Sequence, residues 1–179
     1  SPINSLQWNF GDGGPIEITT DKTVPVGHDY ASAGKYWAKL TVRSGIGCEG
    51  SVAKTIAVVP FASPRDGDNY LSGFNSSDEG WLALALRSDS TLNSWTHSGQ
   101  QWTTAATGSY KPEERSALYS PSFDLTALSR PIMSFENTLE LGSSDGVVLE
   151  YSIDNKNIAD PTKNWETLGL LTDGVVSGV

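Results

Sequence analysis

The stretch that most constrains the fold joins two alternating segments through a glycine-rich turn. Leu6, Trp8 and Phe10 alternate with polar residues, so a strand there would have one apolar and one polar face. Residues 11–15 then supply glycines for positive φ, an aspartate for backbone hydrogen bonding and a proline with fixed φ. Residues 36–43 resume the alternation. Two such strands are typical of the inner faces of a β-sandwich.

Three motifs follow one another in this part of the chain. They are W-x-F-G-D-G at residues 8–13, H-x-Y at 28–30 and G-x-Y-x-x-x-L-x-V at 34–42. Their order and spacing resemble the PKD domain, an immunoglobulin-like module of extracellular proteins, over about residues 1–60. Domains of that family carry further strands ahead of the first motif, so the resemblance leads us to expect a slice of a longer, secreted protein. It identifies a module and a compartment but no ligand.

Composition excludes several classes of protein. Only 18% of the 179 residues are charged, 18 are glycine, and no run has the apolar spacing of an amphipathic helix. The net charge of −9 argues against partners that are nucleic acids or anionic membranes and suits a secreted protein or one that binds cations. No apolar run approaches the roughly 18 residues that a membrane-spanning helix needs.

The second half of the chain predicts another all-β sandwich. Short alternating segments at residues 81–86, 131–139 and 147–154 are separated by turn signals. We therefore expect a first domain at 1–60, a linker at 61–65 and a second domain at 66–179. Prolines at both ends of the linker make it short and stiff, and the apolar Phe61 between them is expected to dock at the domain junction.

A second resemblance covers about residues 66–179. The order G-W, S-W, Y-S-P-S-F-D-L, P-x-x-S-F-E, D-G-x-x-x-E-Y-S-x-D-N and W-x-x-L-G is similar to jelly-roll, MAM-like domains of large Bacteroidetes surface proteins. In that family a tight S-x-D-N-G-x-x-W turn is frequent. Here Asn155 runs into a longer segment without the turn glycine before Trp165. The resemblance implies an adhesin with its C-terminal part absent, type IX secretion and gliding motility.

Oxygen-bearing side chains predict calcium as the inorganic partner. Asp66, Asp68 and Asn69 supply three donors within four residues, and Glu136 with Asp145 could converge from neighbouring strands. Ca²⁺ takes carboxylate and amide oxygens of this kind in flexible loops. No EF-hand pattern is present, and solvated loop carboxylates are the competing interpretation.

Three tryptophans are candidate ligand contacts. Trp37 is out of phase with the apolar residues of its segment and falls on the same face as Lys39. An outward aromatic there is an inter-domain contact, a packing surface for preceding strands, or a platform for stacking sugars. Trp95 and Trp102 either line a rim or pack inside the second sandwich.

No residue pattern predicts catalysis. The only histidines are His28, which belongs to the H-x-Y motif and is expected to order a turn, and His97, which is expected to be a solvated residue of a polar loop. The sequence has no G-x-S-x-G, H-E-x-x-H or C-x-x-C motif, and nothing brings two carboxylates, such as Glu113 or Glu114, across a groove. Cys48 has no second cysteine to pair with inside this chain, so it is a turn residue or a partner for a preceding strand.

These features predict a non-catalytic segment of a large secreted or cell-surface bacterial protein that acts in adhesion. Its partners would be a surface polysaccharide or another protein, together with neighbouring domains of the same chain. The alternative is a carbohydrate-binding or spacer segment accessory to a secreted hydrolase, because PKD-like modules also occur beside catalytic domains. Repeats of these modules in the full polypeptide would favour the adhesin, and an adjoining catalytic domain the accessory role.

Overall fold

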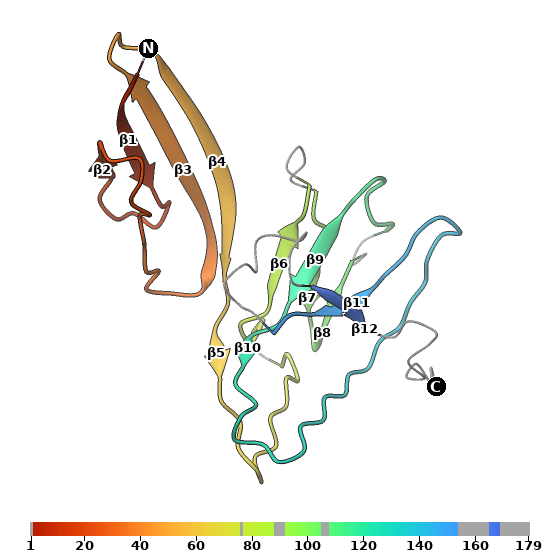
Figure 1. Ribbon diagram of the computed structural model, residues 1–179. Helices are drawn as coiled ribbons and strands as arrows, with labels where there is room; N and C mark the ends of the chain where they lie inside the picture. The colour runs from red at the N-terminus through yellow and green to blue at the C-terminus, as the bar shows by residue number, and fades with distance from the viewer. Residues whose placement is uncertain (1, 76, 88–91, 105–107, 154–164, 169–179) are drawn as a thin grey trace.

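In the computed structural model, residues 2–75, 77–87, 92–104, 108–153 and 165–168 are described, and their regular elements are all strands (Figure 1). The all-β prediction is confirmed. No helix long and apolar enough to cross a membrane occurs within these ranges. We call residues 2–59 the first unit and the described residues from 60 onward the second unit.

The first unit is one antiparallel sheet in the order β2-β1-β3-β4. Its strands are β1 (Ile3–Asn9), β2 (Glu17–Thr19), β3 (Gly34–Ser44) and β4 (Glu49–Val58). The register places Trp8 opposite Leu40 and Leu40 opposite Val52, so the apolar residues of three strands share one face. The alternation in the sequence therefore fixes both the strands and their register.

Aromatic rings cover part of that apolar face. Phe10, which is 9% exposed, stacks on His28 with ring centres 3.9 Å apart. Tyr30 meets His28 edge-on at 4.8 Å and stacks on Tyr36 at 4.2 Å. The hydroxyl of Tyr30 donates to the carbonyl of Phe10 at 3.1 Å. The motif residues thus form a row of rings that holds the long connection between β2 and β3 against the sheet.

The second unit consists of four two-stranded pairings. These are β5 (Phe61–Ala62) with β10 (Ser122–Phe123), β6 (Leu82–Ala85) with β9 (Ser116–Tyr119), β7 (Thr96–Ser98) with β8 (Gln101–Thr103), and β11 (Leu149–Tyr151) with β12 (Glu166–Leu168). All are antiparallel except β5–β10, which is parallel. The innermost residues lie on β6 and β9, where Leu84 is 5% and Tyr119 8% exposed.

The two units meet at the end of β4, and the connection is part of a sheet. Ala57 on β4 packs in one cluster with Leu84 and Tyr119 of the second unit. Figure 1 shows β4 running into β5, whose neighbour is β10. The amide of Ser122 donates to the Pro60 carbonyl at 2.9 Å. The expected linker at 61–65 therefore begins as a paired strand.

One expectation about this junction is wrong, and one alternative for Trp37 is excluded. Phe61 is 64% exposed and Trp37 59% exposed, so neither is buried between the units. The contacts come instead from Ala57 and Val59, which pack in the cluster with Leu84 and Tyr119, and from Lys35, whose ammonium donates to the Ala83 carbonyl at 3.2 Å. Within the second unit, Gly80 lies so close to Pro60 that a Cβ would come within 2.4 Å of its ring.

The strand predicted at 131–139 is also wrong, because residues 131–148 lie in no strand. Apolar side chains of this segment face solvent, with Ile132 91% and Phe135 57% exposed. Alternation shows that a segment is able to form a strand, but a strand also needs a neighbour for its backbone groups. Of the strand expected at 147–154, β11 retains three residues.

Candidate functional site

The turn after β1 is built around Asp12. The Nε2 of His28 lies 2.7 Å from Asp12 Oδ2 and donates to it, while the Gly14 amide donates to Oδ1 at 3.0 Å. The hydrogen bond from His28, with that from Gly14, holds the pKa of Asp12 below its ordinary value of 3.8. The other ring nitrogen of His28, Nδ1, lies 3.9 Å from Glu17 Oε1. His28 therefore orders the turn, as expected from the H-x-Y motif.

Glycine is required at the start of the same turn. Gly11 has a φ of +79°, and a Cβ there would lie 2.7 Å from the backbone oxygen of Trp37. Both conditions exclude a larger residue without a shift of the chain. The turn is thus pressed against β3 directly beside Trp37.

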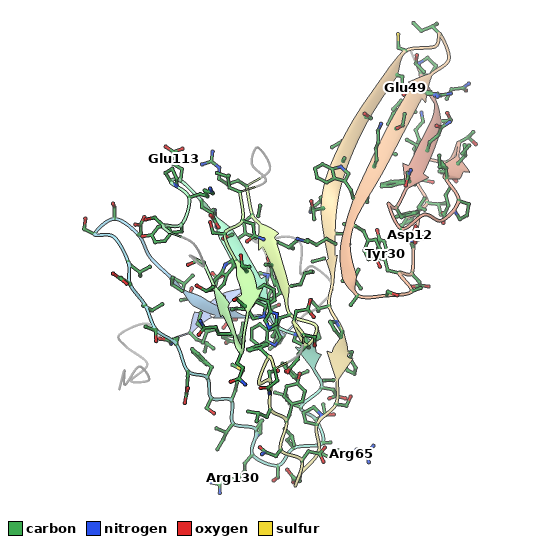
Figure 2. All side chains as sticks on the ribbon, turned by 180° about the vertical axis from the view of Figure 1, so that it is seen from behind. Asp12, Tyr30, Glu49, Arg65, Glu113 and Arg130 are labelled. Atoms are coloured by element: carbon green, nitrogen blue, oxygen red, sulfur yellow. The ribbon has the colours of Figure 1, made fainter. Side chains whose placement is uncertain are left out.

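The predicted calcium ligands at residues 66–69 have partners within the protein. Asp66 Oδ1 accepts a hydrogen bond from the Ser129 amide at 3.1 Å, and Asp68 Oδ2 accepts one from the Arg65 amide at 2.7 Å. The first bond ties two distant loops together at one end of the second unit, the end at which Figure 2 shows both Arg65 and Arg130. These carboxylates act as loop caps.

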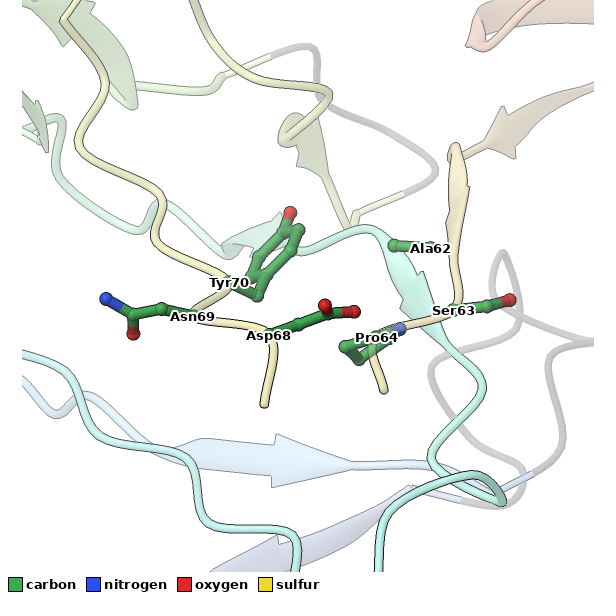
Figure 3. A pocket seen from close by; sticks show the side chains of 6 residues that line it. All are labelled: Ala62, Ser63, Pro64, Asp68, Asn69 and Tyr70. Carbon is green, nitrogen blue, oxygen red and sulfur yellow. The ribbon is translucent and has the colours of Figure 1, made fainter. Parts of the chain in front are cut away.

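A shallow hollow of about 420 Å³ lies next to these residues. Ala62, Ser63, Pro64, Asp68, Asn69 and Tyr70 line it (Figure 3). In Figure 3 the side chains of Asp68 and Asn69 point in opposite directions, so the two predicted ligands do not face a common point.

Tyr70 meets Phe123 of β10 edge-on at 5.1 Å. Sequence reasoning missed Tyr70, although an aromatic residue directly after a polar loop is a usable signal.

The other two predicted ligands lie in the segment without strands. Glu136 is exposed there, and Asp145 Oδ2 accepts a hydrogen bond from the Tyr110 hydroxyl at 2.5 Å. The same hydroxyl accepts the Gly142 amide at 3.0 Å. Among the described residues, no three His, Cys, Asp or Glu side chains are gathered as a metal would require. Calcium stays a prediction, and the structure does not bring its five proposed ligands together.

The acidic pair Glu113 and Glu114 has a structural use. Glu114 Oε1 accepts hydrogen bonds from the Ser94 amide and the Ser116 hydroxyl, both at 2.6 Å, and Oε2 accepts the Ser94 hydroxyl at 2.5 Å. Burial acts to raise the pKa of Glu114, but these hydrogen bonds outweigh it and lower the pKa. Glu113 instead lies at the surface, 3.9 Å from Arg87. Glu114 is therefore held by hydrogen bonds to two serines, whereas Glu113 is exposed.

Trp95 and Trp102 are partly buried in the second unit. Trp102 on β8 lies across from His97 on β7, with ring centres 5.7 Å apart. The Nε2 of His97 lies 3.0 Å from the carbonyl of Phe74. Phe74 also meets Trp81 edge-on at 5.6 Å. Trp102 therefore belongs to an aromatic cluster that packs the unit, and His97 bonds inside it rather than lying solvated in a loop.

Trp37 has the opposite setting. It projects from the middle of β3, is 59% exposed and is opposite Thr55 of β4. Its indole is the most exposed among the tryptophans that the structure describes. Of the three alternatives raised by the sequence, burial between the two units is excluded here by that exposure.

Comparison with known proteins gives one match. The family model described as the PKD domain matches residues 1–59, which supports the first resemblance over about a third of the chain. Neither a curated protein nor a solved structure is similar enough to the chain to count as a match. PKD domains are typically extracellular and occur as adhesion or spacer modules.

Proposed function

We propose that the chain is a non-catalytic segment of a large secreted or cell-surface bacterial protein, where it acts as a stiff adhesive spacer. The PKD match over residues 1–59 supports the extracellular setting. The observation that carries the mechanical part is the junction, because the connection between the units is itself hydrogen-bonded into a sheet. The jelly-roll topology of the second unit is part of this proposal.

The junction restricts motion in a way that its small area would not. Domains joined in one chain move relative to each other unless their interface is large and apolar. Here Ala57 contributes only a small buried side chain, at 8% exposure. The backbone adds to this contact, because the Pro60 and Ala62 carbonyls accept hydrogen bonds from the amides of Ser122 and Asp124. These bonds fix the connection to the second unit up to the residues that directly follow β4. A rigid arm of this kind holds an adhesive surface at a fixed distance from the cell.

The test measures distances between the units. Cys48 is exposed at the turn between β3 and β4 and is the only cysteine in the sequence, so it takes one spin label. A second label at Ser98→Cys, exposed on β7, reports on the second unit. Pulsed electron paramagnetic resonance on the 179-residue chain should give one narrow distance distribution. A broad distribution in the unsubstituted junction would replace the stiff spacer by a flexible tether.

A matched pair of variants assigns the stiffness to the junction. Ala57→Asp places a charge in the apolar cluster with Leu84 and should broaden the distribution, because a carboxylate buried among apolar side chains loses its hydration. Ala53→Asp makes the same change on the same face of β4, where the residue is exposed, and should leave it narrow. Equal broadening by both variants would argue against the junction.

The finer parts of the proposal rest on the second resemblance alone. Type IX secretion and a role in gliding motility belong to the adhesin interpretation. The accessory role beside a secreted hydrolase remains the alternative. The domains that adjoin this segment in the full polypeptide decide between them, since repeats indicate an adhesin and a catalytic neighbour indicates an accessory.

The non-catalytic part has its own test. Purified protein should not turn over peptide, ester or glycan substrates. The carboxylate of Glu136 is exposed to solvent. Turnover that disappears in the Glu136→Gln variant would contradict the non-catalytic role but would leave the spacer role untouched.

A further inference from the structure

The outer surface of the first sheet carries an aromatic residue among cations. The register puts one set of residues on the same side of β1, β3 and β4, which we call the Trp37 face. Its members are Ser5, Gln7, Asn9, Lys35, Trp37, Lys39, Thr41, Arg43, Glu49, Ser51, Ala53, Thr55 and Ala57. One end of this face, at Lys35 and Ala57, contacts the second unit, and the rest extends away from it.

The neighbours of Trp37 leave its indole uncovered. Thr55 is its cross-strand partner on β4, and on the other side Gly11 lies against its backbone where β1 has ended. Both have small side chains or none. Contact between a large apolar ring and water is unfavourable, and such exposed rings are enriched at sites where a ligand covers them. The indole is therefore presented as a flat platform.

The Trp37 face has a positive net charge, whereas the protein as a whole is negatively charged. The face carries three basic residues, Lys35, Lys39 and Arg43, and one acidic residue, Glu49, whereas the whole chain has a net charge of −9. Arg43 pairs with Glu49 at 2.9 Å. Lys39 is exposed and has no ion pair or side-chain hydrogen bond in the described part of the chain. A local positive field on an acidic protein attracts an anion to this face.

We propose that the Trp37 face binds an acidic polysaccharide, with a sugar ring stacked on Trp37 and its carboxylate or sulfate groups paired with Lys39 and Lys35. The apolar C–H face of a sugar ring packs on an indole, and residues two apart on one strand lie about 6.6 Å from each other. Lys39 therefore reaches a charged group on the stacked ring or the next one. The ammonium of Lys35 has three N–H donors, so it can bond to an anion while one of them donates to Ala83. The inference deepens the proposed adhesive role and rests on it.

The test measures binding of defined polymers to the 179-residue chain by titration calorimetry at low salt. The probes are alginate for carboxylates, dextran sulfate for sulfates, neutral dextran, and poly-L-glutamate as a polyanion without rings. We expect one or both acidic polysaccharides to bind, and which of them binds identifies the acidic group. Binding should weaken as salt is raised, because exposed charges are screened.

Substitutions locate the site. Trp37→Ala and Lys39→Glu should each weaken binding by about tenfold or more, and Trp37→Phe should weaken it less because a ring remains. Lys54→Glu is the matched control, since the register puts Lys54 opposite Ala38 on the other face of the same sheet. It should bind like the unsubstituted protein. Both Trp37 and Lys39 are exposed, so circular dichroism should show these variants folded.

Several results would overturn the inference. They are the absence of binding to either acidic polysaccharide, equal binding of neutral dextran or of poly-L-glutamate, and an equal loss from Lys54→Glu and Lys39→Glu. None of these alters the distance distribution between Cys48 and residue 98. A failure here is therefore distinguishable from a failure of the spacer role.

Discussion

At the scale of single residues, two carboxylates hold turns in place through hydrogen bonds that require the ionised form. Asp12 joins the turn after β1 to His28, and Glu114 joins the chain around Ser94 to β9. In both cases the folded protein lowers the pKa of the carboxyl group. A lowered pKa stabilises the folded state where the group is ionised in both states, and this stabilisation is lost as the pH falls.

Asp12→Asn should reduce stability near neutral pH but not in acid. The folded pKa of Asp12 lies below the ordinary value of 3.8, so its contribution is complete above that value and disappears as the pH falls through the lowered one. Denaturant unfolding of both proteins at pH 7 and at stepwise lower pH measures the difference. In a His28→Phe background, which keeps a ring over Phe10, Asp12→Asn should have little further effect. A pH-independent difference would contradict this assignment.

Glu114→Ala should destabilise the protein by about 2 kcal/mol, because it removes an ionised acceptor of hydrogen bonds from Ser94 and Ser116. Glu113→Ala is the control. Its carboxylate is exposed and 3.9 Å from Arg87, so the loss should stay within about 0.5 kcal/mol. Both values come from urea unfolding at neutral pH. Similar losses from the two variants would show that the hydrogen bonds of Glu114 contribute little.

At the scale of elements, the pairing of β1 with β3 depends on the turn that lies against it. Gly11 and Gly13 have nearly the same φ, +79° and +83°, but only Gly11 touches β3. The first motif therefore places one glycine for conformation and close contact, and another for conformation alone. Comparison of the two positions therefore separates the penalty for a positive φ from the penalty for a steric clash with β3.

Gly13→Ala should cost about 1–2 kcal/mol, the penalty of a left-handed conformation for a residue with a Cβ. Gly11→Ala should cost about 1–3 kcal/mol more, because its Cβ would also collide with the backbone of Trp37. The difference between their free energies of unfolding isolates the steric part. If the two variants are equally stable, the turn moves away from β3 without penalty.

Elements were predictable where the sequence pattern also determines a partner. Trp8, Leu40 and Val52 lie on one face because their segments alternate in phase, and a sheet with one apolar face has only one suitable register. Residues 131–139 also alternate in part but pair with no strand in the described part of the chain, and the expected convergence of Glu136 and Asp145 was not found there. The outward position of Trp37 was predictable, because it depends only on the alternation within its own strand.

At the scale of the whole molecule, the units share an apolar cluster and a hydrogen-bonded connection. The residues that form this junction were not predictable, because Ala57 and Lys35 carry no signal that distinguishes them from other strand residues. The apolar Phe61 was expected there, but the backbone pairing with Ser122 holds the connection and leaves the ring outside. A side chain's hydrophobicity does not show which side of a two-residue strand is covered.

The shared junction should make the two units unfold together. Differential scanning calorimetry of the 179-residue chain should give a single transition whose calorimetric and van't Hoff enthalpies agree. Ala57→Asp should split it into two, because the cluster with Leu84 no longer couples the units. Ala53→Asp should keep one transition. Two transitions in the unsubstituted protein would mean that the contact transmits no stability.

The paired connection also affects how the protein survives outside a cell. A protease binds its substrate as an extended chain with free backbone groups, and it cuts exposed, unpaired segments first. The carbonyls of Pro60 and Ala62 are already bonded to the amides of Ser122 and Asp124. Among the described residues, the unpaired segment at 131–141 should therefore be cleaved long before the connection. A cut there would trim the second unit while leaving the two units joined.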